Sequence, residues 1–219
     1  MNRSTLVLLT TLVLLAGCAS YDGAPDTEKS ARLHTKSYKD EHGLYIVGQV
    51  LTRTESKESY LGSTFPSNEY IPVILRVANG SENGDEYSLK IEDLSLQSSE
   101  KQQFEQVDAR DVLDESSYSA WRSSFFWLLA MYPGYLVLDS VWKANDAMRL
   151  DWTQKALGDT NVPAGPDYDL RGMVLFRLAS GDELKGVDLG ELSLKVRLDR
   201  SNRTEPGGLV EETLLLQDR

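Results

Sequence analysis

Alternation of apolar and polar residues over short stretches is the feature that most constrains the fold of this chain. In residues 192–198, Leu and Val alternate without interruption with Ser, Lys and Arg. Because successive side chains of a β-strand point to opposite faces of a sheet, this segment predicts a strand with one buried face and one wet face. The apolar positions are Leu192, Leu194, Val196 and Leu198.

Further strand candidates fall into two groups, separated by turn signals such as Asn79-Gly80 and Pro206-Gly207-Gly208. Pro72 lacks an N–H group, which favours an edge position or the start of a strand. A slip or bulge is expected at Glu92-Asp93. About seven short strands of this kind predict a mainly β protein, a single antiparallel β-sandwich. The remaining candidates are 44–51, 69–79, 87–96, 104–107, 171–178 and 209–216.

A helical segment is predicted between the two groups, at about 111–158. Its second half, 142–157, has apolar residues at steps of three and four, and Gly158 can end that helix. The stripe consists of Leu138, Val141, Asn145, Met148, Trp152 and Ala156, with Lys143, Arg149, Asp151 and Lys155 mostly on other faces. Since proline breaks or bends a helix, Pro133-Gly134 predicts a turn between two helices. The sandwich is therefore expected to carry a helical hairpin insertion.

The N-terminus reads MNRSTLVLLTTLVLLAGC, in which Arg3 precedes an uncharged run from Leu6 to Leu15. This run is too short to cross a bilayer core of about 30 Å as a helix, so it is typical of a secretion signal. Leu15-Ala16-Gly17-Cys18 resembles the lipobox of bacterial lipoproteins. The resemblance implies cleavage of residues 1–17 and diacylglycerol on the thiol of Cys18, usually with an acyl chain such as palmitate on its amino group. Two or three acyl chains anchor a protein durably to a membrane.

Residues 18–42 are polar and predict a flexible tether between the lipid and the domain at 43–219. Fully extended, such a tether reaches roughly 75 Å. A residue other than Asp after the cysteine, here Ala19, implies by the same resemblance a place at the outer membrane of the cell envelope, which we expect to face the periplasm.

Three segments in order, YIPVILRVANGSE, ANDAMRLDWTQKALGDTNVPAGPDYDLRGMVLFRL and GELSLKVRL, resemble bacterial lipoproteins and secreted modules with an immunoglobulin-like sandwich. The resemblance implies that fold for residues 43–219 and makes Pro163 and Gly172 backbone devices. Such modules have no common activity, so no functional site is transferred.

Composition argues against several functions. A net charge of −11 disfavours nucleic-acid binding, because that function needs a basic face. The single cysteine excludes an intrachain disulfide, and His34 and His42, the only histidines, lie in the tether. No nucleophile elbow, zinc-protease or phosphate-loop motif occurs. The acids that could serve a hydrolase or hold calcium are Asp108, Asp111, Asp114, Glu115, Asp167 and Asp169, but solvated loops and helix starts explain them better, since their spacing matches no known ligand loop. We expect no enzyme and no metal or cofactor beyond the covalent lipid.

The aromatic run in 121–142 is the best candidate for a binding site. It either packs on one sheet face as a helical hairpin or is an exposed apolar patch for a protein partner or the membrane surface. Aromatic anchors dominate protein interfaces. The candidate residues are Trp121, Phe125, Phe126, Trp127, Leu129, Tyr132 and Tyr135. The expected function is that of a non-catalytic, membrane-anchored lipoprotein. A carrier of a small apolar ligand, with the helical segment over a cavity between the sheets, and a carboxylate-based hydrolase remain as alternatives.

Overall fold

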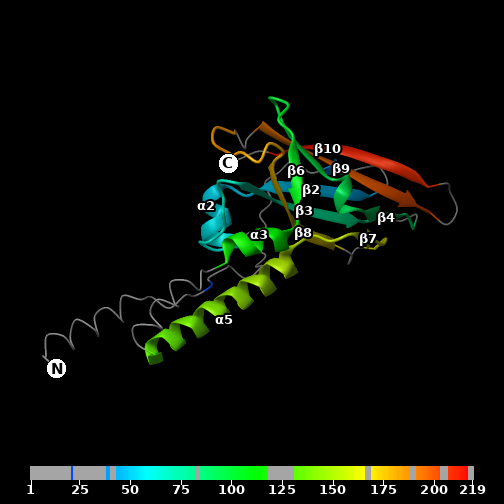
Figure 1. Ribbon diagram of the computed structural model, residues 1–219. Helices are drawn as coiled ribbons and strands as arrows, with labels where there is room; N and C mark the ends of the chain where they lie inside the picture. Colours follow the sequence, from blue (N-terminus) through cyan, green and yellow to red (C-terminus); the bar gives the residue numbers. More distant parts are fainter. Residues whose placement is uncertain are drawn as a thin grey trace, which may run out of the picture.

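Two antiparallel β-sheets form the centre of the protein, and helices lie on one side of them (Figure 1). The computed structural model describes residues 21, 38–39, 43–81, 84–117, 131–165, 169–187, 191–202 and 207–216. The strands are β1 Tyr38–Lys39, β2 Leu44–Val50, β3 Tyr70–Asn79, β4 Glu86–Leu89, β5 Ser95–Ser98, β6 Phe104–Val107, β7 Thr160–Val162, β8 Asp169–Leu178, β9 Leu192–Ser201 and β10 Gly208–Leu216. The helices are α2 Arg53–Glu55, η2 Ser56–Tyr60, η3 Ile91–Asp93, α3 Ala109–Ser116 and α5 Met131–Lys155.

The first sheet, sheet A, has the strand order β1-β2-β3-β8-β6, and the second, sheet B, has the order β10-β9-β4-β7 with β5 also on β9. All these pairings are antiparallel. The longest registers run from Tyr70↔Arg177 to Ala78↔Asp169 in sheet A and from Gly208↔Arg200 to Leu216↔Leu192 in sheet B. The prediction of a mainly β protein with antiparallel, sandwich-like sheets is confirmed.

The expected bulge near Glu92-Asp93 is larger than one residue. Both β4 and β5 pair with β9, from Leu89↔Leu198 to Ser95↔Lys195, and the turn η3 lies between them. Residues 90–94 therefore stand opposite only 196–197. The two short strands act as one strand that is interrupted by an excursion.

The facing sides of the two sheets enclose a largely aliphatic cluster, the sandwich cluster. The predicted stripe of β9 lies in it and is almost completely buried. Gly48 of β2 faces the same interior, where an added Cβ would lie 2.9 Å from Leu216 Cδ2. The members contributed by β3 are Ile71, Val73, Leu75 and Val77.

The other side of sheet A is covered by α3, α5 and η2, which form a second cluster, the helix-side cluster (Figure 1). Ile74 of β3 and Met173 of β8 face it, while their neighbours face the sandwich. Burial along β3 is therefore nearly continuous, because both of its faces are covered. The remaining members of the helix-side cluster are Leu51, Tyr60, Leu61, Phe65, Tyr70, Ala109, Val112, Leu113, Met148, Trp152 and Leu175.

The predicted turn at Pro133-Gly134 is wrong, because Met131–Lys155 is one helix. Pro133 therefore lies inside α5: a proline removes one backbone hydrogen bond of a helix and can bend it, but here it does not separate two helices. The expected first arm of the hairpin, in 121–130, lies outside the described residues.

Pro72 belongs to a central strand, so of the two places predicted for it the strand start is correct and the edge is not. It is the third residue of β3, and its carbonyl accepts the N–H of Leu51 at 2.9 Å, just beyond the end of β2. The missing N–H therefore falls on the side where the ladder with β2 has ended.

Candidate functional site

Helix α5 buries one face of its described length against the rest of the protein. Val141, Ala144, Met148, Trp152 and Lys155 recur at steps of three and four and are at most 5% exposed. The predicted apolar stripe is thus confirmed at three of its positions, and Lys155 joins it although its charge placed it elsewhere. The helix runs obliquely outward from the sheets, with its Met131 end farthest from them (Figure 1).

The loop after β2 supplies the polar partners for this stripe. Thr52 and Glu55 form a reciprocal capping box, which starts α2 and leads directly into η2. At the end of η2, the carbonyls of Tyr60 and Leu61 turn toward α5. The indole Nε1 of Trp152 donates to Leu61 O at 3.0 Å, and Lys155 Nζ donates to Tyr60 O at 2.6 Å.

Lys155 is a buried charge with a complete set of contacts. Its ammonium pairs with Asp151 Oδ2 at 2.6 Å, and it lies 4.5 Å from the centre of the Tyr60 ring. Burial of an ammonium is costly unless it is paired and hydrogen-bonded, so these contacts keep it in place. The side chain of Asp151 remains 22% exposed, which leaves one side of the pair open.

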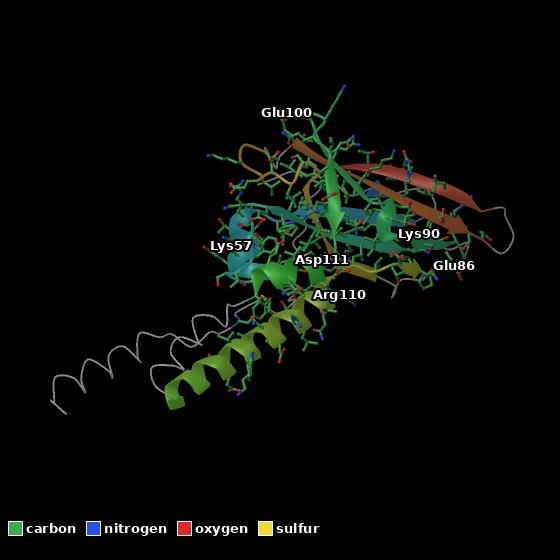
Figure 2. The ribbon with its side chains drawn as sticks, viewed as in Figure 1. Lys57, Glu86, Lys90, Glu100, Arg110 and Asp111 are labelled. Atoms are coloured by element: carbon green, nitrogen blue, oxygen red, sulfur yellow. The ribbon has the colours of Figure 1, made fainter. Side chains whose placement is uncertain are left out.

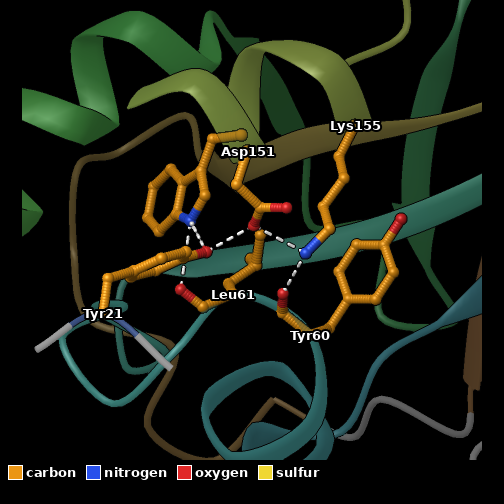
Figure 3. Close-up of polar contacts among 6 residues, drawn as sticks. Tyr21, Tyr60, Leu61, Asp151 and Lys155 are labelled. Carbon is orange, nitrogen blue, oxygen red and sulfur yellow. Dashed lines mark hydrogen bonds and ion pairs between the residues drawn. The ribbon is translucent and has the colours of Figure 1, made fainter. Parts of the chain in front are cut away.

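Tyr21 contacts the Asp151 carboxylate from another direction, and the 22% exposure of Asp151 is what remains with Tyr21 in place (Figure 3). Its hydroxyl donates to Asp151 Oδ2 and accepts from Trp152 Nε1 at 3.0 Å, while its ring packs against the helix-side cluster. The partners are 130 and 131 residues away in the sequence. We call this arrangement of Tyr21, Asp151, Trp152 and Lys155 the Tyr21 dock.

The receiving side of the dock has its own hydrogen bonds without Tyr21. Trp152 Nε1 keeps Leu61 O, and Lys155 keeps both Tyr60 O and Asp151. Removal of Tyr21 therefore leaves no buried donor without an acceptor among these groups, and the cost is limited to the contacts that Tyr21 itself makes.

The outward face of α5 carries large apolar side chains. Trp142 is 53% exposed and Leu150 is 62% exposed, and at eight residues apart they lie on the same side of the helix. The described helix contains three acids and three bases, so it is formally neutral in a chain of charge −11. Lys143 and Asp139 form an exposed i,i+4 pair on it.

The candidate acidic residues near α3 have structural partners. Asp108 is the N-cap of α3 and accepts the Arg110 N–H at 2.8 Å, and Asp114 pairs with Arg149 at 3.3 Å on the surface. Asp111 projects from the first turn of α3 beside Arg110 (Figure 2). Among the described residues, no group of three or more His, Cys, Asp and Glu side chains is placed to hold a metal ion. Asp167 and the side chain of Asp169 lie outside the described part.

Glu115 has a specific role in attaching α3 to sheet A. Its carboxylate accepts the hydroxyl of Tyr70 at 2.7 Å. Burial, together with the hydrogen bond to the Glu115 carboxylate, raises the pKa of Tyr70 to about 12. The phenol is therefore held in its neutral, donating form.

A buried polar cluster at the end of β3 is structural. Asn79 Nδ2 donates to Asp85 O at 2.7 Å and to Val162 O at 3.1 Å, and its Oδ1 accepts the Ser81 N–H at 3.1 Å. The carboxylate of Asp85 accepts from Asn202 at 2.6 Å. These bonds tie the turn after β3 to β7 and to the end of β9, and they occupy the groups that a ligand would need.

One pocket of about 250 Å³ lies where the start of α3 and the end of α5 meet β6 and β8. Pockets that enclose drug-sized ligands are usually about 300–1,000 Å³. No strand of sheet B lines this pocket, so it is not the cavity between the sheets that a carrier of an apolar ligand would need. Its lining residues are Ile91, Gln106, Val107, Asp108, Ala109, Ala156, Leu157, Met173, Val174 and Leu175.

Most of the predicted functional residues lie outside the described residues. Cys18 belongs to this group, as do Trp121, Phe125, Phe126, Trp127 and Leu129. Tyr132 and Tyr135 lie in the first turn and a half of the described α5, without a description of their side chains. The dock residues Tyr21 and Lys155 were not predicted as functional. No local sequence pattern could reveal Tyr21, because its contacts are more than 100 residues away.

No protein-family model, curated protein or solved structure matches the chain. None of the helices that the structure describes combines the length and apolar character needed to cross a membrane.

Proposed function

We propose that this chain is a non-catalytic lipoprotein of the bacterial envelope, anchored in the outer membrane through lipid on Cys18 and facing the periplasm. Its domain is an immunoglobulin-like sandwich in which α3 and α5 form an insertion between β6 and β7. The aromatic segment 121–135 binds a protein partner of the envelope. The lipobox residues before Cys18 support the anchor.

The direction of α5 is the observation that supports the binding role most. The helix leads outward from the sheets, and its far end carries Tyr132 and Tyr135, next in sequence to the aromatic residues 121–129 (Figure 1). A projecting helix with tyrosines at its far end suits an interface, because aromatic side chains provide much of the binding energy there. The sandwich serves as the support that orients it.

Replacement of the cysteine tests the anchor. In the native host, Cys18→Ser should move the protein from the membrane fraction to the soluble fraction or leave it as an uncleaved precursor. Ser20→Ala, two residues away, is the matched control and should stay in the membrane fraction. Membrane association that is the same for Cys18→Ser and the unmodified chain would contradict the anchor.

Site-specific crosslinking tests the binding role. A photo-reactive amino acid at Trp127 or Tyr132 should capture one envelope protein, and Phe126→Asp or Leu129→Asp in the same chain should abolish the capture. The same probe at Leu209, on the outer face of sheet B, is the control and should not capture this protein. If both Asp variants fail to fold, the aromatic segment belongs to the core and the proposed binding role is wrong.

A further inference from the structure

The Tyr21 dock joins the region of the anchor to the folded domain. Tyr21 follows Cys18 by only three residues, and its hydroxyl and ring are held by α5 and the helix-side cluster. Residues 18–42 were expected to act as a tether of roughly 75 Å. Because Tyr21, the fourth residue of this segment, is held by the domain, only the stretch from Cys18 to Tyr21 sets the distance between the lipid and the domain.

Three residues span at most about 10–11 Å when fully extended. A lipid on Cys18 sits at the bilayer surface, since its acyl chains are in the hydrocarbon layer. Tyr21 is therefore within about 11 Å of that surface, which is close to the diameter of one helix. The segment between Tyr21 and the domain at residue 43 then adds nothing to the separation of α5 from the membrane.

We propose that the Tyr21 dock holds the domain against the bilayer, with the outward face of α5 between Trp142 and Leu150 in contact with the lipid surface. This inference rests on the proposed lipidation of Cys18 and gives the proposed function a position. The envelope partner must then be reached at the membrane surface, instead of tens of ångströms above it.

The outward face of α5 has the chemistry that such a contact needs. Trp142 and Leu150 are exposed on one side, and Trp side chains favour the interface between water and lipid. The helix is formally neutral, so an anionic lipid surface repels it less than it repels the rest of this acidic protein. Basic residues are too few for electrostatic attraction to hold the contact, which leaves the lipid anchor and apolar burial as its causes.

The opposite side of the molecule combines ion pairs with two exposed leucines, Leu209 and Leu215. The outer face of sheet B carries Lys195 and Arg197 of β9, both paired with Glu211 of β10. It also exposes Leu209, which at 62% has the same exposed fraction as Leu150. Two leucines of equal exposure thus lie on opposite layers of the protein, and they provide a matched pair of probe sites.

The test uses the full, lipidated protein in vesicles. Cys18 is the only cysteine and its thiol carries the lipid, so Leu150→Cys and Leu209→Cys each introduce one reactive thiol for a nitrobenzoxadiazole fluorophore. The vesicles consist of phosphatidylethanolamine and phosphatidylglycerol, with a nitroxide on part of the headgroups. We expect the nitroxide to quench the fluorophore at position 150 at least twofold more than at position 209. Equal quenching at the two sites overturns the inference.

Substitution of Tyr21 tests the dock itself. Tyr21→Ala should lower quenching at position 150 to the value at position 209, because the full tether then separates the domain from the bilayer. Tyr21→Phe removes only the hydroxyl that bonds Asp151 and Trp152, leaves Lys155 paired with Asp151, and should act in the same direction. Both variants should keep the circular dichroism spectrum of the folded protein. If quenching at position 150 stays unchanged in both, the dock does not position the domain.

Vesicle flotation separates this inference from the proposed function. Protein that fails to float with the vesicles contradicts the anchor, and the dock inference falls with it. Protein that floats but shows equal quenching at positions 150 and 209 contradicts only the position of α5.

Discussion

The two faces of sheet A differ in how they are covered and in what they bury. On the side of sheet B, the cluster is mostly Ile, Val and Leu from both sheets, with Tyr87, Phe104 and Phe176 as its aromatic members. On the helix side, the cluster contains Trp152, Phe65 and Tyr70, and next to it lies the buried ammonium of Lys155. The rings of Phe65 and Trp152 meet edge to face with centroids 5.5 Å apart.

The two sides of sheet A therefore differ in how strictly they require particular residues. On the side of sheet B, many different apolar residues of suitable total volume could fill the core. The helix side depends on particular donors and acceptors, because Trp152 Nε1 and Lys155 Nζ are satisfied only if the carbonyls at the end of η2 and the side chains of α5 are correctly placed. It is also the side that faces the proposed anchor.

Truncation of Trp152 should lower the stability of the protein more than any other substitution considered below. Trp152→Ala removes a fully buried indole from the helix-side cluster and should lower the free energy of unfolding by about 3–5 kcal/mol. Trp142→Ala, on the exposed face of the same helix, should change it by less than about 1 kcal/mol. Urea unfolding followed by circular dichroism measures both, and equal losses would show that the helix side contributes no more than the surface.

Gly172→Ala, which adds one methyl group, tests the close contact between β8 and the chain that leaves α5. The chain that leaves α5 meets β8 here: Leu157 N–H donates to Met173 O at 2.8 Å, and a Cβ on Gly172 would lie 2.8 Å from Leu157 Cα. Gly172→Ala should therefore cost about 1–3 kcal/mol. Gly158→Ala has no atom within 4 Å of its added Cβ and should be neutral or slightly stabilising in the same urea titration. Equal effects of the two substitutions would contradict the close approach.

Alkaline pH should weaken the helix side selectively through Tyr70. Its pKa is raised to about 12 in the folded protein from an ordinary value near 10, so the neutral phenol is favoured by folding. The stabilisation is complete below pH 10 and is lost as the pH rises toward 12. Tyr70→Phe should cost about 1 kcal/mol at pH 7 through the lost hydrogen bond and should flatten stability between pH 10 and 12. An unchanged alkaline slope in this variant would contradict the assignment.

The smallest effect is expected on the outer face of sheet B. Glu211 accepts from Lys195 and Arg197, and these hydrogen bonds lower the pKa of its carboxyl group. Solvent screens both ion pairs, because all three side chains are at least partly exposed. Glu211→Gln should therefore leave the melting temperature almost unchanged. Differential scanning calorimetry at low and high salt checks this. A loss as large as that of Tyr70→Phe would mean that the outer face is as specific as the helix side.

Sequence alone predicted the strands that have one wet face more clearly than those covered twice. In β9 the alternation of Leu and Val with polar residues appears directly in burial. In β3 the odd positions from Ile71 to Val77 were assigned correctly, but Ile74 is also fully buried because helices cover the second face. An alternation of apolar and polar residues arises when one face of a strand is exposed to solvent. It is absent when both faces are buried.

The candidate site was predicted less well, for physical reasons that differ between residues. Lys155 was placed away from the apolar stripe because its charge disfavours burial, yet a carbonyl, a carboxylate and an aromatic ring compensate it. Tyr21 lies in a polar stretch without periodicity, and its partners are distant in sequence. Both depend on tertiary contacts that no local pattern contains.

The most direct measurement is the mass of the N-terminal peptide of the mature protein isolated from membranes. The account predicts a peptide that begins at Cys18, with diacylglycerol on the thiol and an acyl chain on the amino group. A peptide that crosses Gly17-Cys18, or a Cys18 thiol that reacts with an alkylating reagent, would contradict the anchor and the position that Tyr21 gives to the domain.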